Sequence, residues 1–204
     1  MPHVITIGRE FGSGGREFGR RLAEEMGWAY YDQEILNEIA KNTDFSKEYI
    51  AELSEKKPLP LYPIHYGHSF IIGQTSAFTQ DIDVFRAQSE AIKQLAAKRN
   101  CVIIGRCADY VLRDQNPIRL FIYADMESKV KRCRERDDKE HLTDQQMAKM
   151  IRKVDKRRKA YYEFYTGRRW GARESYDMLI NTSNTDIKAL AKILSIHFSE
   201  EEGE

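Results

Sequence analysis

Short apolar runs alternate with longer amphipathic stretches along this chain. Residues 3–8 read HVITIG, a β-branched run closed by a glycine, and residues 100–105 read NCVIIG. Because such runs are continuously apolar rather than alternating, they predict strands that are buried on both faces of a sheet. The predicted strands span residues 3–8, 28–32, 100–105, 118–124 and 176–183.

The stretches between these strands have helical periodicity. Phe18, Leu22 and Met26 recur every fourth residue, and Gly27 follows as a helix C-cap. Alternation of strand and helix predicts an α/β fold with a central parallel sheet covered by helices on both faces. In such sheets, ligands bind beyond the carboxyl ends of the strands. The predicted helices span residues 16–27, 33–43, 83–99, 126–138, 144–165 and 185–198.

The length of 204 residues predicts one domain with a single large core, spanning residues 1–204. Residues 55–82 differ from the rest of the chain in composition and pattern, because they hold three prolines and few helical repeats. We interpret this segment as an insertion or as an excursion that binds a second substrate.

Charge and cysteine content narrow the classes of function. Thirty-three Lys and Arg nearly balance thirty-two Asp and Glu, which argues against a nucleic-acid or membrane partner. Three cysteines without a CxxC spacing argue against a disulfide framework and against a zinc site, and we expect no protein-bound structural metal. No stretch reaches the roughly twenty apolar residues that span a bilayer. A reduced, cytoplasmic setting is therefore expected.

A glycine-rich loop, GREFGSGGRE at residues 8–17, joins the first predicted strand to the first helix. Backbone N–H groups of Gly12, Ser13, Gly14 and Gly15 can converge there on a phosphate, next to the positive end of the helix dipole. The strict pattern GxxxxGK[ST] is not met, since Gly15 stands at the lysine position and Arg16 at the hydroxyl position. A tight turn without a ligand is the alternative interpretation.

The remaining strand ends carry further polar motifs. They are YYDQEIL after the second strand, GRCAD after the third, DKRR at 155–158 in a later helix, and DMLINTS at the last strand. Together with GSGGRE, and in this order, they resemble the cytidylate kinase-like family of nucleoside-monophosphate kinases. The resemblance implies a three-layer P-loop NTPase-type fold with a helical lid at about 126–170. It further implies ATP and Mg²⁺ as cofactors and small-molecule nucleotides as substrates.

Phosphoryl transfer needs cations around the transferred group, and arginine suits this because its guanidinium binds phosphate through two N–H groups. By resemblance, the lid arginines close over both substrates, and we expect Arg16 to compensate partly for the displaced lysine. The alternative for each arginine is a solvated helix face, with Arg16 pairing with a carboxylate such as Glu10. The predicted catalytic residues are Arg16, Arg132, Arg136 and Arg158, and the predicted ATP-binding residues are Gly12, Ser13, Gly14, Gly15, Arg16 and Glu17.

The acceptor site is predicted from the other strand ends. Asp32 follows the second strand, where it orients the acceptor or caps the helix at 33–43. The family's GRD reads Gly105-Arg106-Cys107 here, so that its acid is lost or supplied by Asp109. By resemblance, Arg86 and Asp155 from two predicted helices join them. The predicted acceptor-binding residues are therefore Asp32, Arg86, Arg106, Asp109 and Asp155.

The favoured function is ATP-dependent phosphoryl transfer to a nucleoside monophosphate, with CMP or dCMP as acceptor. Two alternatives remain open. One is a kinase of the same fold for a small alcohol, with Asp32 as the general base. The other is a nucleotide-binding regulatory protein without turnover, for which the altered loop is the supporting feature. The sequence does not indicate an oligomeric state.

Overall fold

A computed structural model describes residues 2–32, 34–41, 73–136 and 142–200 of the chain. Five parallel strands form one sheet in the order β2-β3-β1-β4-β5. They are β1 (Val4–Arg9), β2 (Ala29–Tyr31), β3 (Cys101–Ile104), β4 (Ile118–Tyr123) and β5 (Met178–Asn181). The predicted α/β fold with a central parallel sheet is confirmed.

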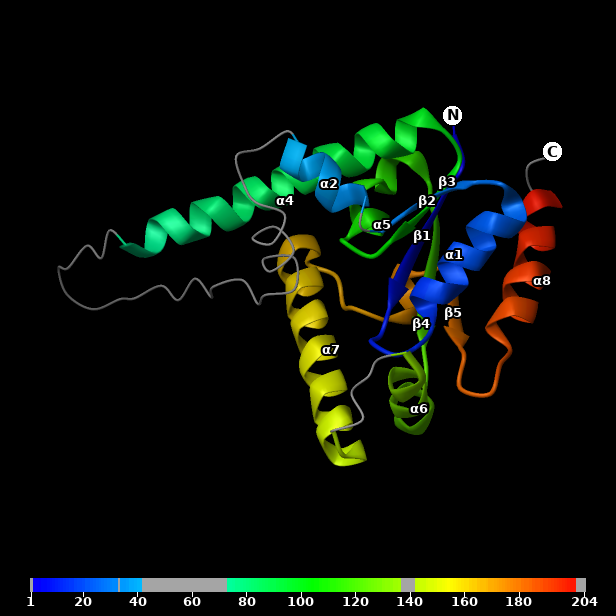
Figure 1. Ribbon diagram of the computed structural model, residues 1–204. Coiled ribbons are helices and arrows are strands. Elements are labelled where there is room, and N and C mark those ends of the chain that lie inside the picture. The colour runs from blue at the N-terminus through cyan, green and yellow to red at the C-terminus, as the bar shows by residue number, and fades with distance from the viewer. Residues whose placement is uncertain (1, 33, 42–72, 137–141, 201–204) are drawn as a thin grey trace.

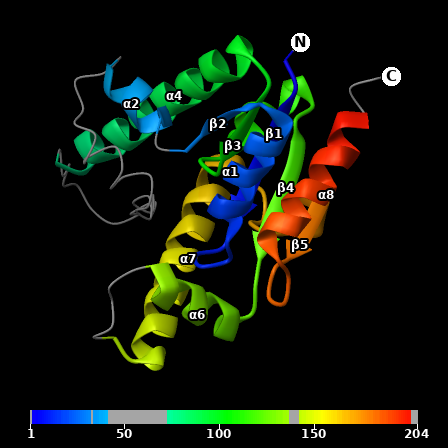
Figure 2. The ribbon, with the colours of Figure 1, turned by 45° about the vertical axis from the view of Figure 1, so that its right-hand side comes forward.

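Helices cover both faces of this sheet (Figure 1). On one face α1 lies beside α8, and α2, α4 and α5 cover the other, while α6 and α7 lie beyond the carboxyl ends of the strands (Figures 1 and 2). The α-helices are α1 (Gly15–Met26), α2 (Glu34–Lys41), α4 (Gly73–Lys98), α5 (Ala108–Val111), α6 (Met126–Arg136), α7 (Asp144–Thr166) and α8 (Ile187–Glu200). Two short 3₁₀ helices, η1 (Arg113–Gln115) and η2 (Arg173–Ser175), complete the described elements.

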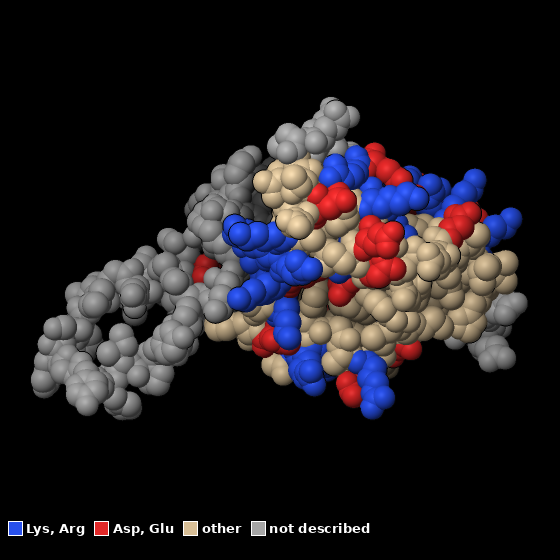
Figure 3. Space-filling view, turned by 90° about the horizontal axis from the view of Figure 1, so that it is seen from below, with Lys and Arg blue, Asp and Glu red and all other residues tan. Residues whose placement is uncertain are grey.

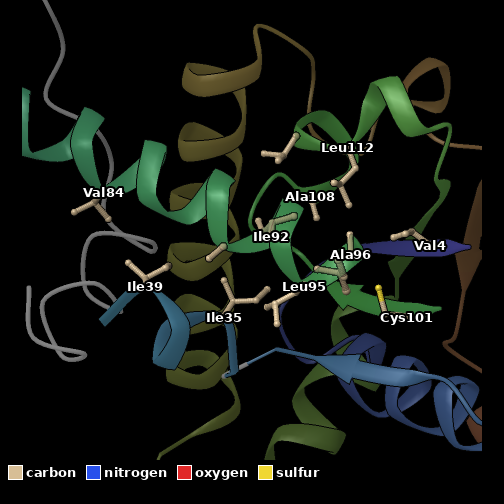
Figure 4. Close-up of a cluster of buried hydrophobic side chains, with 13 residues drawn as sticks. Val4, Ile35, Ile39, Val84, Ile92, Leu95, Ala96, Cys101, Ala108 and Leu112 are labelled. Atoms are coloured by element: carbon tan, nitrogen blue, oxygen red, sulfur yellow. The ribbon is translucent and has the colours of Figure 1, made fainter. Parts of the chain in front are cut away.

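Alternate residues of the central strands serve two separate cores. Ile5 and Ile7 of β1 pack with Phe18 and Leu22 of α1 on the face that α8 also covers. Val4 faces the other way, into a cluster built on α2, α4 and α5 (Figure 4). The strands are therefore buried on both faces, as their unbroken apolar runs predict.

Most predicted elements are found within two residues of their expected ends. Gly27 takes a left-handed conformation and caps α1, as predicted. The prediction for α4 is wrong at its start, because the helix begins at Gly73 rather than at residue 83. No proline follows Pro63 before this helix ends, so the backbone hydrogen bonds can propagate through polar residues that carry little periodicity. The rest of the predicted excursion, residues 55–72, and residues 137–138 lie outside the described residues.

Gly19 fixes the distance between α1 and the sheet. A Cβ at this position would lie 2.5 Å from Cδ1 of Ile104 and 2.9 Å from Cδ1 of Ile7. The helix therefore approaches β1 and β3 more closely than a side chain would allow. Because the glycine loop leads directly into α1, this packing also positions the loop at the end of β1.

We expect Gly19→Val to lower the free energy of unfolding by about 1–3 kcal/mol, because the added carbons overpack a filled core. Urea unfolding measures the change. Arg20→Val is the matched control on the exposed side of the same helix, where only a surface pair with Glu24 is lost. Its effect should stay below about 1 kcal/mol. Equal effects of the two substitutions would contradict the close packing at Gly19.

Candidate functional site

Two cavities adjoin at the carboxyl end of the sheet. The larger, of about 330 Å³, lies over the glycine loop and is lined by Arg9, Glu10, Phe11, Gly12, Gly14, Gly15, Arg16, Glu17, Arg132, Cys133, Glu135 and Arg158. The smaller, of about 60 Å³, is lined by Gly8, Arg9, Gly105, Arg106, Cys107, Asp109, Arg158, Tyr161, Tyr162, Trp170 and Tyr176. Arg9 and Arg158 belong to both walls. We call these the loop cavity and the β3 cavity.

The glycine loop has a backbone that only glycine adopts easily. Gly12 and Gly14 have φ angles of +74° and +79°. Such alternation in a loop that leads into a helix is the geometry in which successive N–H groups form a concave anion site. The buried Ser13 stabilises the loop from inside, since its hydroxyl donates to the Glu10 carbonyl oxygen at 2.8 Å. The sequence-predicted residues Gly12 to Glu17 thus line or support the loop cavity.

Gly15, at the lysine position of the strict pattern, has no room for a side chain. Its Cβ would lie 2.7 Å from Cβ of Arg9 and 3.1 Å from Cβ of Ile122. The lysine is thus absent from a place that the side chain of Arg9 already occupies. Sequence reasoning found the missing lysine but not its steric cause.

Arg9 is the main residue that sequence reasoning missed. It ends β1, and its guanidinium crosses over Gly105, where a Cβ would overlap with Nη1 of Arg9. Withdrawal from water lowers the pKa of Arg9 to about 9, and the cations of Arg158, Arg106 and Arg16 act in the same direction, whereas Asp32 opposes them. The group stays charged at neutral pH. A signal was present in the sequence, since Arg9 directly follows the apolar run of β1.

A buried lysine connects the loop to both lid helices. Nζ of Lys129 on α6 lies 2.6 Å from Oε2 of Glu10 and 3.1 Å from Oδ2 of Asp155 on α7. The other oxygen of Asp155 accepts a hydrogen bond from the N–H of Phe11 at 2.6 Å. Lys129 and Asp155 therefore hold the loop in place, and binding of the acceptor by Asp155 stays a prediction.

Arg132, one turn further along α6, faces the other side of the loop. Its guanidinium donates to the carbonyl oxygens of Thr182 and Ser13. The Thr182 hydroxyl lies 2.6 Å from the Ser13 carbonyl oxygen, so the TS of the predicted motif at the last strand also fastens the loop. Arg132 still lines the loop cavity, and the predicted position beside the phosphates stands as a proposal.

Arg16 forms an ion pair with Asp32. Its Nε lies 2.6 Å from Oδ2 of Asp32, whose side chain is buried at the end of β2. Pairing of Arg16 with a carboxylate was one of the two alternatives drawn from the sequence, but the partner differs from the expected Glu10, which binds Lys129 instead. The reason is the fold, which brings the start of α1 against β2. The predicted capping role of Asp32 concerns residue 33, which lies outside the described residues.

The end of β3 is a strained turn. Gly105, Arg106 and Cys107 have φ angles of +67°, +56° and +56°, a left-handed conformation that costs about 1–2 kcal/mol for each residue with a side chain. The turn holds Arg106 in the wall of the β3 cavity, and its carbonyl oxygen accepts a hydrogen bond from Gln88 at 3.0 Å. Strain of this kind typically persists where function requires a fixed geometry.

Asp109 lies in the same wall, in the first turn of α5. The Tyr162 hydroxyl donates to its Oδ2 at 2.6 Å. Burial nevertheless raises the pKa of Asp109, because a charged carboxylate is poorly solvated there. The structure therefore brings together Arg106, Asp109 and Arg158, as the motif order predicts, and adds the hydroxyl of Tyr162, which the sequence did not single out.

Three further predicted residues are Arg86, Arg136 and Glu17. Arg86 is exposed on α4 and lines neither cavity within the described residues. The side chain of Arg136 lies outside the described part of the structure. Glu17 lines the loop cavity while pairing with Arg21 at 2.8 Å. Seen from below, the side of Figure 1 on which α6 and the start of α7 lie, basic side chains gather with acidic ones among them (Figure 3).

Comparisons with known proteins agree with the motif order. The sequence model described as the cytidylate kinase-like family matches residues 4–184. The chain belongs to the cytidylate kinase-like family. A cytidylate kinase from Archaeoglobus fulgidus is 22% identical, with 93% of this chain and 91% of the relative covered. The chain is thus a member of a kinase family, which makes it a phosphotransferase of the nucleotide and small-molecule kinase class.

Solved structures show the same fold. An uncharacterized protein from Eubacterium ventriosum superposes with a TM-score of 0.69 at 29% identity, covering 97% of this chain and 98% of that one. Shikimate kinase from Bacteroides thetaiotaomicron gives 0.55 at 13% identity, with 97% and 98% covered. Shikimate kinase from Acinetobacter baumannii gives 0.51 at 19% identity, with 98% and 94% covered. The P-loop kinase fold that the sequence predicts is therefore confirmed.

Within the residues described, no helix is both long and apolar enough to span a membrane. The same residues contain no cluster of three or more histidine, cysteine or acidic side chains that is suited to hold a metal ion.

We expect Lys129→Met to lower the free energy of unfolding by about 2–4 kcal/mol, because it leaves the carboxylates of Glu10 and Asp155 together without their cation. Lys131→Met, on the exposed side of the same helix, is the matched control and should change little. Urea unfolding of both variants measures the difference. A small effect at Lys129 would show that the loop does not depend on this ion cluster.

The raised pKa of Asp109 predicts a pH-dependent contribution to stability. Between the ordinary pKa of 3.8 and the raised value, the folded state binds more protons than the unfolded state, so stability falls as the pH rises through this window. Asp109→Asn removes this loss and keeps an acceptor for Tyr162. The variant should therefore gain stability relative to the native chain as the pH rises above about 4. Asp114→Asn, at an exposed site, should show no such trend in urea unfolding.

Proposed function

We propose that this chain transfers the γ-phosphoryl group of ATP to a nucleoside monophosphate, with CMP or dCMP as the first candidates. The observation that carries the proposal is the pair of adjoining cavities whose common wall is Arg9 and Arg158. A nucleoside-monophosphate kinase must hold two anionic substrates end to end, with cations where they meet. Membership of the cytidylate kinase-like family supports the choice of acceptor class.

The loop cavity suits the phosphates of ATP. Its volume lies at the lower end of the range for small-molecule sites, and its floor is the glycine loop with two positive φ angles. A Cβ at Gly12 would lie 3.0 Å from Sγ of Cys133, so the loop packs closely against α6 and leaves its open side to the cavity. Since Arg16 stands where the strict pattern has a hydroxyl, we propose that Mg²⁺ is held by phosphate oxygens and water.

The β3 cavity suits the anionic end of the acceptor. With about 60 Å³ it holds a group of the size of one phosphate, and it presents Arg9, Arg106 and Arg158. The guanidinium fork matches phosphate oxygens in pairs. We propose that the acceptor's base lies beyond this cavity and that Arg106 and Arg158 orient the attacking phosphate oxygen.

The chemistry follows from this arrangement. Bound ATP supplies the phosphoryl group, whose bond to ADP breaks with its electron pair remaining on ADP, while an oxygen of the acceptor phosphate forms the new bond to phosphorus. An ionised acceptor phosphate carries no proton that must be removed, so no general base is needed. The arginines at the junction stabilise the charge that spreads over the transferred oxygens. Burial of the junction strengthens this stabilisation, because fewer waters screen the charges.

The rival acceptor is a small alcohol, which would need a carboxylate to accept the hydroxyl proton. Asp32 is buried at the end of β2, but its carboxylate is paired with Arg16. Asp109 accepts a hydrogen bond from the Tyr162 hydroxyl, so one of its two oxygens is already engaged. The described carboxylates thus favour an acceptor that is already an anion.

ADP release in a coupled assay tests the proposal across nucleoside monophosphates, shikimate and simple sugars. CMP or dCMP should give the highest kcat/KM. If the protein prefers an alcohol such as shikimate or a sugar, the proposed acceptor class is wrong, but the assignment as a kinase stands. ATP-dependent thermal stabilisation without ADP release from any acceptor would support the regulatory, non-catalytic alternative instead.

For the acceptor that proves active, we expect Arg106→Ala to raise KM or lower kcat by at least about tenfold, equivalent to about 1.4 kcal/mol. ATP affinity should change little, because Arg106 lines only the β3 cavity. Arg113→Ala is the control, since this exposed arginine contacts the ring of Tyr110 outside both cavities. A selective loss of ATP affinity in Arg106→Ala would assign the residue to the donor side.

A further inference from the structure

Arg9 and Gly15 have exchanged the residue types that the strict phosphate-loop pattern requires. In GxxxxGK, the second glycine comes five positions after the first, and the lysine directly follows it. With Gly14 as the second glycine, the first glycine position is occupied by Arg9 and the lysine position by Gly15. Positions 9 and 15 together still hold one cation and one glycine, but the cation now comes first.

The two changes depend on each other sterically. The Cβ of Arg9 fills the space that a side chain at position 15 would need, at 2.7 Å from its Cβ. A lysine at position 15 is compatible with the loop only when position 9 is small. Conversely, once position 9 carries a side chain, glycine is the residue that fits at position 15.

The guanidinium of Arg9 lies where a transferred phosphate has to pass. It extends over Gly105 and lines both the loop cavity and the β3 cavity. Arg158 shares this position and approaches the backbone of the same residue, with Nη1 3.4 Å from the Arg9 carbonyl oxygen. Arg16 is less well placed, since its Nε is directed to Asp32.

The electrostatic surroundings of Arg9 favour a polyanionic ligand. Among the charged groups that act most strongly on it are the cations Arg158, Arg106 and Arg16 and one carboxylate, Asp32. Cations gathered in a partly buried site repel one another, and a phosphate chain placed between them relieves this repulsion. The site is therefore better suited to a bound triphosphate than to the empty state.

We propose that Arg9 does the work of the missing phosphate-loop lysine and contacts the transferred phosphoryl group between donor and acceptor. The inference rests on the proposed kinase function. An arginine at position 9, before the loop, would then act in place of a lysine at position 15, at the end of the loop. Arg9 then approaches the phosphates from the end of the strand and offers two N–H groups in one plane rather than a point charge.

A residue exchange tests this role. Arg9→Gly should lower kcat at saturating ATP by about a hundredfold or more, the scale of losing one stabilising donor in a buried site. Gly15→Lys alone should also be inactive, because its side chain meets that of Arg9. The double variant Arg9→Gly with Gly15→Lys restores the GxxxxGK part of the pattern and should exceed Arg9→Gly by at least about tenfold in kcat. Arg20→Ala, exposed on α1, is the control with native turnover.

Binding of ATP supplies a second measurement that does not require an acceptor. By titration calorimetry, Arg9→Gly should bind ATP at least about tenfold more weakly than the native chain, while the affinity for adenosine stays within about twofold. Arg9→Gln, which keeps most of the side-chain volume, should show the same loss if Arg9→Gly does not fold. Circular dichroism checks the fold of each variant.

The outcomes separate the two proposals. Native-like ATP affinity and kcat in folded Arg9→Gly and Arg9→Gln would overturn the role of Arg9, as would a folded double variant no more active than Arg9→Gly. Failure of every acceptor in the panel would overturn the proposed reaction instead. In that case the ATP titrations alone decide the role of Arg9, with equal affinities refuting it.

Discussion

The buried ammonium of Lys129 is the interaction on which the rest of the site depends. It pairs with Glu10 from the glycine loop and with Asp155 from α7, and its own helix, α6, also carries Arg132 to the loop. Two carboxylates share this one cation. Glu10 also lines the loop cavity, so part of this cluster lies beside the arginines there.

The glycine loop is held by contacts from several elements, although arginines surround it. The side chain of Asp155 accepts from the N–H of Phe11, so the first part of the loop is fixed from α7. Ser13 and Thr182 fix the second part from β5. Arg9 and Arg158 line both cavities, and Arg158 also contacts the loop, because its Nη1 lies 3.4 Å from the Arg9 carbonyl oxygen and its guanidinium lies over the ring of Phe11.

The sequence was sufficient to predict the fold, but not the side-chain partners at the candidate site. Unbroken apolar runs and the glycine loop depend on local pattern, and they predicted the strands and the strand-to-helix turn. The pairing of Arg16 with Asp32, and of Lys129 with Glu10, joins residues from different elements, so their spacing along the chain carries no signal. Arg9 was not predicted because the strict pattern places its cation after the second glycine and not at the end of the strand.

The side chain of Arg9 couples the glycine loop sterically to the strained turn at the end of β3. The guanidinium of Arg9 can cross to the β3 cavity only because residue 105 is a glycine with a positive φ angle, so that no Cβ blocks its course. The left-handed conformation continues through Arg106 and Cys107 and places Arg106 in the wall of that cavity. An arginine at position 9, glycines at 15 and 105, and the strained turn therefore form one steric unit. A change at any one of them alters the space available to the others, which is why the departure from the lysine-containing pattern involves two loops rather than one position.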